Sequence, residues 1–133
     1  MQHLSEEQIA TLRAKLEASA ADLRQRVAGD RADMLEGVNS GEPGDVEDAA
    51  QADHQRFRSK SFLDRDSALL REVEAALERM DSGSYGICED TDEPIPYRRL
   101  ELEPTTRFTV AALEQREDEF GEVDPHGSEP IGY

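Results

Sequence analysis

The chain has 133 residues, of which 35% are charged and 5% aromatic, and it contains no tryptophan. This composition argues against a thick globular core and favours exposed helices over a sheet-based domain. The formal net charge is −16, from 31 acidic and 15 basic residues. Nucleic acid and anionic membranes attract Lys/Arg surfaces, so this charge argues against both and favours basic protein surfaces as partners. An acidic composition is nevertheless common among soluble proteins and selects no function by itself.

Two further features indicate the compartment. No apolar run approaches the length of a membrane span, and residues 1–5 lack the basic and apolar regions of a signal peptide. The single cysteine, Cys88, has no partner for an internal disulfide. We therefore expect a cytoplasmic protein that has no membrane partner.

The first predicted helix begins at a capping box. Ser5 and Gln8 have the spacing of the box, and Leu4 and Ile9 are placed to form the hydrophobic staple around it. Apolar residues then recur every three or four positions, which predicts one apolar stripe on an otherwise charged helix. The stripe consists of Ile9, Leu12, Leu16, Ala20, Leu23 and Val27. It thins beyond this point, and we expect the helix to end near Glu36.

A second predicted helix follows a chain reversal. Residues 37–44 contain three glycines and a proline, which break a helix. The second helix starts at Val46, and Gly83 fits the residue just beyond its end. Its stripe consists of Val46, Ala49, Ala50, Phe57, Phe62, Leu69, Val73, Ala76 and Met80. We assign Phe57 and Phe62 to packing between the helices rather than to a binding surface.

Because each helix has one apolar stripe, we predict that the two pack antiparallel as a hairpin over residues 1–83, with its tip at about residues 37–50. The tip carries a D-x-x-D-x-A pattern, Asp45-Val46-Glu47-Asp48-Ala49-Ala50. One interpretation is a probe, a cluster of carboxylates held on a short turn. The other is that these acids cap the second helix and offset its dipole, at ~0.3–1 kcal/mol each. On spacing alone, the capping interpretation is the stronger.

The remaining chain changes character after the hairpin. Residues 84–103 contain short apolar pairs, prolines and a polar turn at 89–93, which predict a small knuckle or irregular hairpin. Pro104-Thr105-Thr106 is expected to open a short third helix through Phe108 and Leu113. We therefore divide the chain into a hairpin at 1–83, a knuckle with its helix at 84–118, and an acidic tail at 119–133 that we expect to be disordered.

The knuckle carries a family resemblance. Four short runs of residues resemble the zinc-finger segment of the DksA/TraR family: Tyr85-Gly86-Ile87-Cys88, Glu93-Pro94-Ile95, Arg98-Arg99-Leu100-Glu101 and Pro104-Thr105. Members of this family are transcription factors that bind RNA polymerase. The family's D-x-x-D-x-A tip maps onto Asp45, Asp48 and Ala50. The resemblance implies a mainly α fold: a long antiparallel helical hairpin (coiled coil) with a small zinc-finger-like subdomain and a short C-terminal helix.

The sequence departs from the family at the zinc ligands. The family finger uses four cysteines spaced C-x2-C-x17-C-x2-C, and these positions are Cys88, Thr91, Thr109 and Ala112 here. One thiolate, two hydroxyls and a methyl group do not hold Zn²⁺, so we expect no zinc and no other cofactor. Cys88 is interpreted as a core residue rather than a reactive thiol. Asp92 replaces a family glycine and still tolerates a left-handed turn. The expected metal-free core consists of Ile87, Ile95, Leu100, Phe108 and Val110.

A second departure concerns the alarmone ppGpp. Some family members bind this anionic nucleotide jointly with polymerase through basic residues, whose positions are Glu72, Glu103 and Leu113 here. Two carboxylates repel such a ligand, so direct ppGpp sensing at that site is not expected. Arg98 and Arg99 are a possible substitute, but we favour an exposed structural arginine pair.

The resemblance implies a regulator that inserts its tip into the secondary channel of bacterial RNA polymerase and modulates open-complex stability. Asp45, Asp48 and Ala50 are the expected contacts, and Arg65 is a further candidate contact whose alternative is a solvated face with helix-spaced ion pairs. We expect a monomer without sequence-specific DNA binding and without enzymatic activity. The main alternative is an acidic helical-hairpin adaptor that has lost the polymerase role. Transcript cleavage of the Gre type ranks last.

Overall fold

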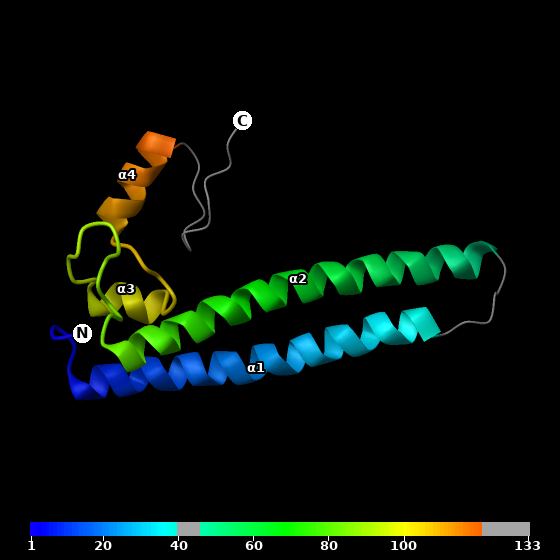
Figure 1. The fold of residues 1–133 in the computed structure, drawn as a ribbon, viewed down its shortest axis with the longest axis horizontal. Helices are drawn as coiled ribbons and strands as arrows, with labels where there is room; N and C mark the ends of the chain where they lie inside the picture. Colours follow the sequence, from blue (N-terminus) through cyan, green and yellow to red (C-terminus); the bar gives the residue numbers. More distant parts are fainter. Residues whose placement is uncertain (40–45, 121–133) are drawn as a thin grey trace. The chain divides into compact units, whose positions relative to one another are not determined.

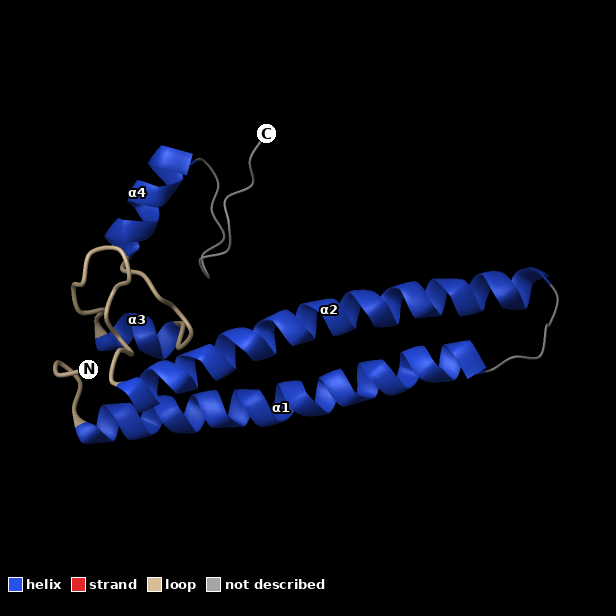
Figure 2. Cartoon of the chain, in the orientation of Figure 1, coloured by secondary structure: helices blue, strands red, loops and turns tan. Residues whose placement is uncertain are grey.

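The computed structural model describes residues 1–39 and 46–120, except for the side chains of residues 36–39, 46–49 and 120. Four helices follow one another: α1 (Glu6–Asn39), α2 (Val46–Ser82), α3 (Tyr97–Leu102) and α4 (Val110–Phe120) (Figure 1). No strand forms in the described ranges (Figure 2), where one isolated antiparallel bridge pairs Ile87 with Pro94. The mainly helical, coiled-coil fold expected from the sequence is therefore confirmed.

The chain divides into two compact units. Met1–Ala18 and Glu72–Tyr133 form the first, called here the finger unit, and Ser19–Arg71 form the second, called the hairpin unit. Each unit contains one part of α1 and one part of α2. Within each unit these two parts lie antiparallel (Figure 1).

The ends of α1 and α2 follow the local chemistry of the sequence. The predicted capping box is confirmed: the Ser5 amide donates to Gln8 Oε1 at 3.0 Å, and the Gln8 amide donates to Ser5 Oγ at 3.1 Å. At the other end, α1 continues to Asn39 rather than stopping near Glu36. Gly83 follows α2 with a φ of +83°, a left-handed conformation that glycine adopts without the steric cost of a Cβ.

The predicted apolar stripe of α1 forms the core of both units. Leu12 and Leu16 are buried in the finger unit, and Ala20, Leu23 and Val27 are buried in the hairpin unit. A Leu or Val side chain stabilises a fold by about 1.5–3 kcal/mol when it is fully removed from water. The stripe therefore supplies α1's share of the helix pairing in each unit.

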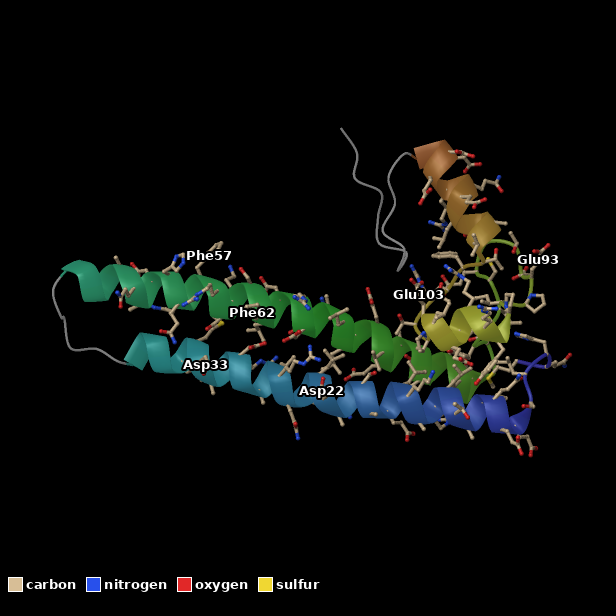
Figure 3. All side chains as sticks on the ribbon, turned by 180° about the vertical axis from the view of Figure 1, so that it is seen from behind. Asp22, Asp33, Phe57, Phe62, Glu93 and Glu103 are labelled. Atoms are coloured by element: carbon tan, nitrogen blue, oxygen red, sulfur yellow. The ribbon has the colours of Figure 1, made fainter. Side chains whose placement is uncertain are left out.

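The second half of α2 buries three of the predicted stripe residues, Val73, Ala76 and Met80, whereas the first half buries other positions than those expected. Besides Ala76, the buried residues of α2 recur every seven positions, at Ser59, Asp66, Val73 and Met80. Phe57 and Phe62 are instead 69% and 52% exposed, so their assignment to the hairpin core is wrong. Figure 3 shows Phe57 on the side of α2 that faces away from α1. A seven-residue period is that of a coiled-coil seam, and in the hairpin unit two of its positions are polar.

A charged layer lies inside the hairpin unit. The Asp66 side chain is 9% exposed and lies 3.6 Å from Arg26 Nη1, while Arg26 Nη2 donates to Asp22 at 2.5 Å. Asp30 is partly buried, and its Oδ2 accepts no hydrogen bond among the described residues. Burial raises the pKa of Asp30, and the neighbouring Asp66 raises it further. The layer thus contains three carboxyl groups, and Arg26 contacts those of Asp22 and Asp66.

Replacing Asp30 by Asn is expected to stabilise the protein at neutral pH by roughly 1 kcal/mol, the usual cost of a buried polar atom that lacks its hydrogen bond. The amide supplies a permanent donor where the wild type has two like charges. Urea unfolding, followed by circular dichroism, gives the free energy of unfolding. Glu17→Gln is the control, because Glu17 is an exposed acid on the same helix outside the charged layer.

The same substitution has a defined pH dependence. Because the folded-state pKa of Asp30 is raised, the native chain binds more protons than the unfolded chain between the ordinary and the raised pKa. The contribution of Asp30 to the free energy of unfolding is therefore complete below its ordinary pKa. This contribution is lost as the pH rises through the raised pKa of the folded state. The advantage of Asp30→Asn should shrink as the pH falls from roughly 7 to roughly 4. A variant less stable than wild type at neutral pH would show that ionised Asp30 stabilises the layer.

Candidate functional site

The predicted tip lies where α2 begins. Asp48 is in the first turn of α2, and Ala50 is exposed two residues later. Asp45 precedes the helix in the sequence and lies outside the described residues, as does the side chain of Asp48. Arg65 is exposed on α2 in the same unit. The roles assigned to these four residues therefore stay predictions.

The exposed face of α2 next to the tip carries positive charge and aromatic surface. Residues 54–60 include Arg56, Arg58 and Lys60 and no carboxylate. Arg56 pairs with Asp53 one turn earlier, at 3.2 Å. Phe57 is exposed between the two arginines. A shallow pocket on this face is lined by Ala50, Gln51, His54, Gln55 and Arg58. This cationic and aromatic surface was missed from the sequence because the phenylalanines were counted as core.

A second candidate site is the knuckle of the finger unit. The chain turns back on itself after α2, and three backbone hydrogen bonds hold the turn: Cys88 N to Glu93 O at 2.8 Å, Asp92 N to Cys88 O at 2.9 Å, and Ile95 N to Gly86 O at 2.7 Å. Asp92 has a φ of 58°, which confirms the predicted left-handed turn. Gly86 has a φ of +80°, which glycine adopts without the steric cost of a Cβ, and an added Cβ would also lie 3.2 Å from the ring of His3.

The family's four zinc-ligand positions come together in this knuckle. Thr109 Oγ1 donates to Cys88 Sγ at 3.8 Å and accepts from the Ala112 amide at 3.2 Å. Thr91 and Ala112 line one pocket beside these groups. Burial raises the pKa of the Cys88 thiol, but hydrogen bonds from Thr91 and Thr109 outweigh burial, and the net pKa is lowered.

The chemistry of these four residues does not fit zinc. A structural Zn²⁺ needs four nitrogen or sulfur ligands in a tetrahedron. Cys88 offers one thiolate, the two threonines offer hydroxyl groups, and Ala112 offers only a methyl group. Across the part of the chain that the structure describes, no three His, Cys, Asp or Glu side chains lie together as a metal site requires. The residues present therefore do not reproduce the family's metal centre.

Apolar and aromatic side chains fill the interior of the knuckle. Of the five residues expected there, Ile95, Leu100 and Phe108 are buried and Ile87 is partly buried. The assignment of Val110 is wrong: it is 51% exposed, because it is the first residue of α4 and Ala112 takes the inward position. Cys88 is fully buried, as a core residue should be.

Tyr85 links the end of α2 to the segment before α4. It is fully buried, and its hydroxyl donates to Pro104 O at 2.6 Å. Burial raises the pKa of Tyr85 to about 12, against the opposing charge of Arg79. The tyrosine therefore stays neutral and keeps its donated hydrogen bond throughout the physiological pH range.

Two ion pairs border the knuckle. Arg116 of α4 contacts both carboxylate oxygens of Asp90, with Nε–Oδ2 at 2.5 Å and Nη2–Oδ1 at 2.7 Å. Arg107 Nη1 pairs with Glu89 Oε2 at 3.1 Å. The hydrogen bond from Arg116 lowers the pKa of Asp90 despite partial burial. Asp90 is therefore held as a carboxylate in this site.

The residues expected near a nucleotide site lie in the finger unit and carry structural roles. Glu103, labelled in Figure 3, is partly buried 3.8 Å from Arg99. Glu72 and Leu113 are also partly buried. Arg99 is not exposed as expected, since it donates from Nε to Phe108 O at 3.0 Å and from Nη2 to Thr106 at 3.3 Å. Arg98 is exposed.

The helices of the described residues include none that is both long enough and apolar enough to cross a lipid bilayer. This agrees with the absence of an apolar run of that length in the sequence.

Comparison with known proteins gives consistent matches. Residues 83–118 match the family model described as the prokaryotic dksA/traR C4-type zinc finger. The RNA polymerase-binding transcription factor DksA of Escherichia coli K12 is 31% identical over 110 residues, which are 82% of this chain and 71% of that protein. The solved structure of the transcription factor DksA2 from Pseudomonas aeruginosa has a TM-score of 0.76 and 33% identity, and the match covers 86% of this chain and 87% of that one.

Two further relatives are matched over less of their length. General stress protein 16O of Bacillus subtilis is 36% identical over 107 residues, which are 74% of this chain and 64% of that protein. DksA of Caulobacter vibrioides is 40% identical over 73 residues, 55% of this chain and 51% of that protein. The chain thus spans between half and two thirds of these two curated relatives.

Removing the Tyr85 hydroxyl tests whether Tyr85 fixes the knuckle. Tyr85→Phe should lower the free energy of unfolding by about 1 kcal/mol, because the Pro104 carbonyl loses its donor in a buried setting. Thermal unfolding of the full chain measures the loss. Tyr97→Phe is the matched control, since this less buried tyrosine should lose much less. Equal losses in the two variants would contradict the role of Tyr85.

Proposed function

The chain belongs to the DksA/TraR family, and we propose from this that it is a transcription regulator that binds bacterial RNA polymerase. In the proposal, the tip of the helical hairpin enters the secondary channel of the enzyme and changes the stability of open promoter complexes. The observation that carries the proposal is the match to DksA of Escherichia coli, which extends over 82% of this chain and therefore includes residues of both long helices.

Asp45 and Asp48 are proposed to act at the tip. A carboxylate that enters a narrow, poorly hydrated channel interacts more strongly with nearby charges than it would in water. Such a group can pair with basic side chains or alter the charge balance around a metal-bound reaction centre. Ala50 is small and exposed, which allows close approach to a channel wall. The proposal needs no sequence-specific contact with DNA, in keeping with the net charge of −16.

The cationic face of α2 is proposed to support binding. Arg58, Lys60 and Arg65 are exposed on the same unit as the tip, in a chain that is otherwise strongly acidic. An acidic surface on the polymerase would attract this face and orient the hairpin as it approaches. We propose that the protein acts in the cytoplasm as a monomer, without catalytic activity of its own and without ppGpp at the position of Glu72 and Glu103.

The alternative is an acidic adaptor that uses the helical hairpin to bind another basic protein. It would require no special role for the tip carboxylates. The two functions are therefore distinguished by whether the effect depends on the tip.

Neutralising the tip carboxylates is expected to reduce the effect on open-complex lifetime while leaving polymerase binding largely intact. Wild type should bind core RNA polymerase and shorten the lifetime of open complexes, measured by filter retention after a heparin challenge. Asp45→Asn/Asp48→Asn should keep affinity within about threefold, because the proposal assigns attachment to the exposed face of α2 rather than to the tip. The double variant should nevertheless lose most of the effect on open-complex lifetime. Asp64→Asn, an exposed acid further along the same helix, is the control.

Three results would contradict parts of this proposal. Failure of the wild type to bind polymerase would favour the adaptor. Retention of the lifetime effect in the double variant would remove the tip from the mechanism. Cleavage of RNA in a backtracked complex would indicate a Gre-type factor.

Replacing Arg65 by Ala should weaken polymerase binding by roughly three- to tenfold at low salt and less at high salt, because an exposed charge acts through a screened field. Affinity at several salt concentrations is the measurement. Arg71→Ala is the matched control, since Arg71 is an exposed arginine further along the same helix. Equal losses for the two variants would point to net charge rather than to a contact at Arg65.

A further inference from the structure

The finger of this chain has to be closed without the metal that four cysteines would bind. In a C4 finger the ion ties the first ligand pair to the second pair, which is far along the chain. The corresponding segments here are residues 88–91 and residues 109–112. The structure holds these two segments together although their side chains do not fit zinc. Another interaction must therefore connect these two segments.

We infer that a two-pronged ion pair between Asp90 and Arg116, stacked against Phe108, closes the finger in place of zinc. Asp90 lies between the two positions of the first ligand pair, and Arg116 lies one helical turn beyond Ala112 on α4. The pair therefore joins the same two segments that the metal would join.

The geometry is that of a strong pair. Both nitrogens at the fork of Arg116 contact both oxygens of Asp90, at 2.5 and 2.7 Å. Bidentate, charge-assisted bonds of this kind are shorter and stronger than neutral ones and fix orientation as well as distance. The side chains are 31% and 27% exposed, so water screens them less than it screens a fully exposed pair.

An aromatic ring holds the arginine in place. The guanidinium carbon of Arg116 lies 4.3 Å from the centroid of the Phe108 ring, within the range of a cation–π contact. Phe108 is almost completely buried in the knuckle core. The ion pair is thereby attached to the core rather than suspended at its edge, and arginine is required because lysine has neither the fork nor the flat face.

A second set of contacts joins the same segments. Glu89 receives Arg107 Nη1 on its carboxylate at 3.1 Å, and its amide donates to Arg107 O at 3.0 Å. Arg107 also lies over the Phe108 ring, at 5.1 Å from the centroid. Thr109 Oγ1 donates to Cys88 Sγ. Contacts from residues 88–90 therefore meet residues 107–116 along one seam, and the Asp90–Arg116 pair is its bidentate member.

The test is a double-mutant cycle on the full chain. Asp90→Asn and Arg116→Gln should each lower the melting temperature by about 5 °C, and the double variant should lose little more than either one, because the two residues act as a pair. Arg116→Lys should behave almost like Arg116→Gln, since the charge alone does not restore the fork. Glu93→Gln and Arg98→Gln are the controls, as both side chains are exposed in the same unit and should change the melting temperature little.

Metal dependence is measured on the same samples. The wild type should melt at the same temperature with EDTA and with added Zn²⁺, and it should contain no stoichiometric zinc after purification. Additive losses in the cycle, or single-variant losses no larger than those of the controls, would overturn the inference. Stoichiometric zinc with an EDTA-sensitive melting temperature would overturn it as well.

Restoring the four cysteine positions tests whether zinc and the ion pair serve the same purpose. Thr91→Cys/Thr109→Cys/Ala112→Cys restores the C-x2-C-x17-C-x2-C spacing around Cys88. In the zinc-loaded variant, Asp90→Asn should cost less than half of its cost in the wild type, because the metal then closes the finger. An undiminished cost would contradict the shared role, while the cycle in the wild-type background stands as a test whether or not this variant folds. None of these measurements involves polymerase, so the inference and the proposed function can fail separately.

Discussion

The pairing of α1 with α2 depends on a seven-residue register that is only partly apolar. Val73 and Met80 continue the register in the finger unit, while Ser59 and Asp66 occupy it in the hairpin unit. Apolar layers stabilise a coiled coil in many registers of the two helices. A buried charge is tolerated only in a register that places an oppositely charged residue against it. The contact of Asp66 with Arg26 forms only when these two residues face each other, so it favours one alignment of the two helices of this unit.

The finger unit meets a different constraint with the same kind of interaction. A small knuckle has too little apolar surface to hold its shape by burial alone, which is why fingers of this size usually bind a metal. This chain combines a buried cluster around Tyr85 and Phe108 with charged groups that reach across the seam. In both units, then, an arginine–aspartate pair joins segments whose relative position apolar packing alone does not fix.

Features that depend on local chemistry were predictable from the sequence: the capping box at Ser5, the glycine after α2, the left-handed Asp92 and the stripe of α1. The buried positions in the first half of α2 were missed because the large apolar side chains there were given more weight than the seven-residue period. Counting back by sevens from Met80 leads through Val73 to Asp66 and Ser59 and leaves Phe57 outside, so the signal was present. Helix α3 was missed because six residues behind a proline give too short a pattern to read. The tip was assigned only through its family motif, and its role stays a prediction.

Charge in this protein is divided between regions rather than spread evenly. The chain carries −16 overall, yet residues 54–60 contain three cationic side chains and no carboxylate, immediately beside the acidic start of α2. An acidic surface would repel a uniformly acidic hairpin. A hairpin with a cationic face can instead be attracted to an acidic surface while its tip still carries carboxylates. Exposed aromatic surface at Phe57 adds an attraction that salt does not screen. In the proposed function, attachment and effect therefore depend on different residues, and a substitution at the tip is not expected to weaken binding.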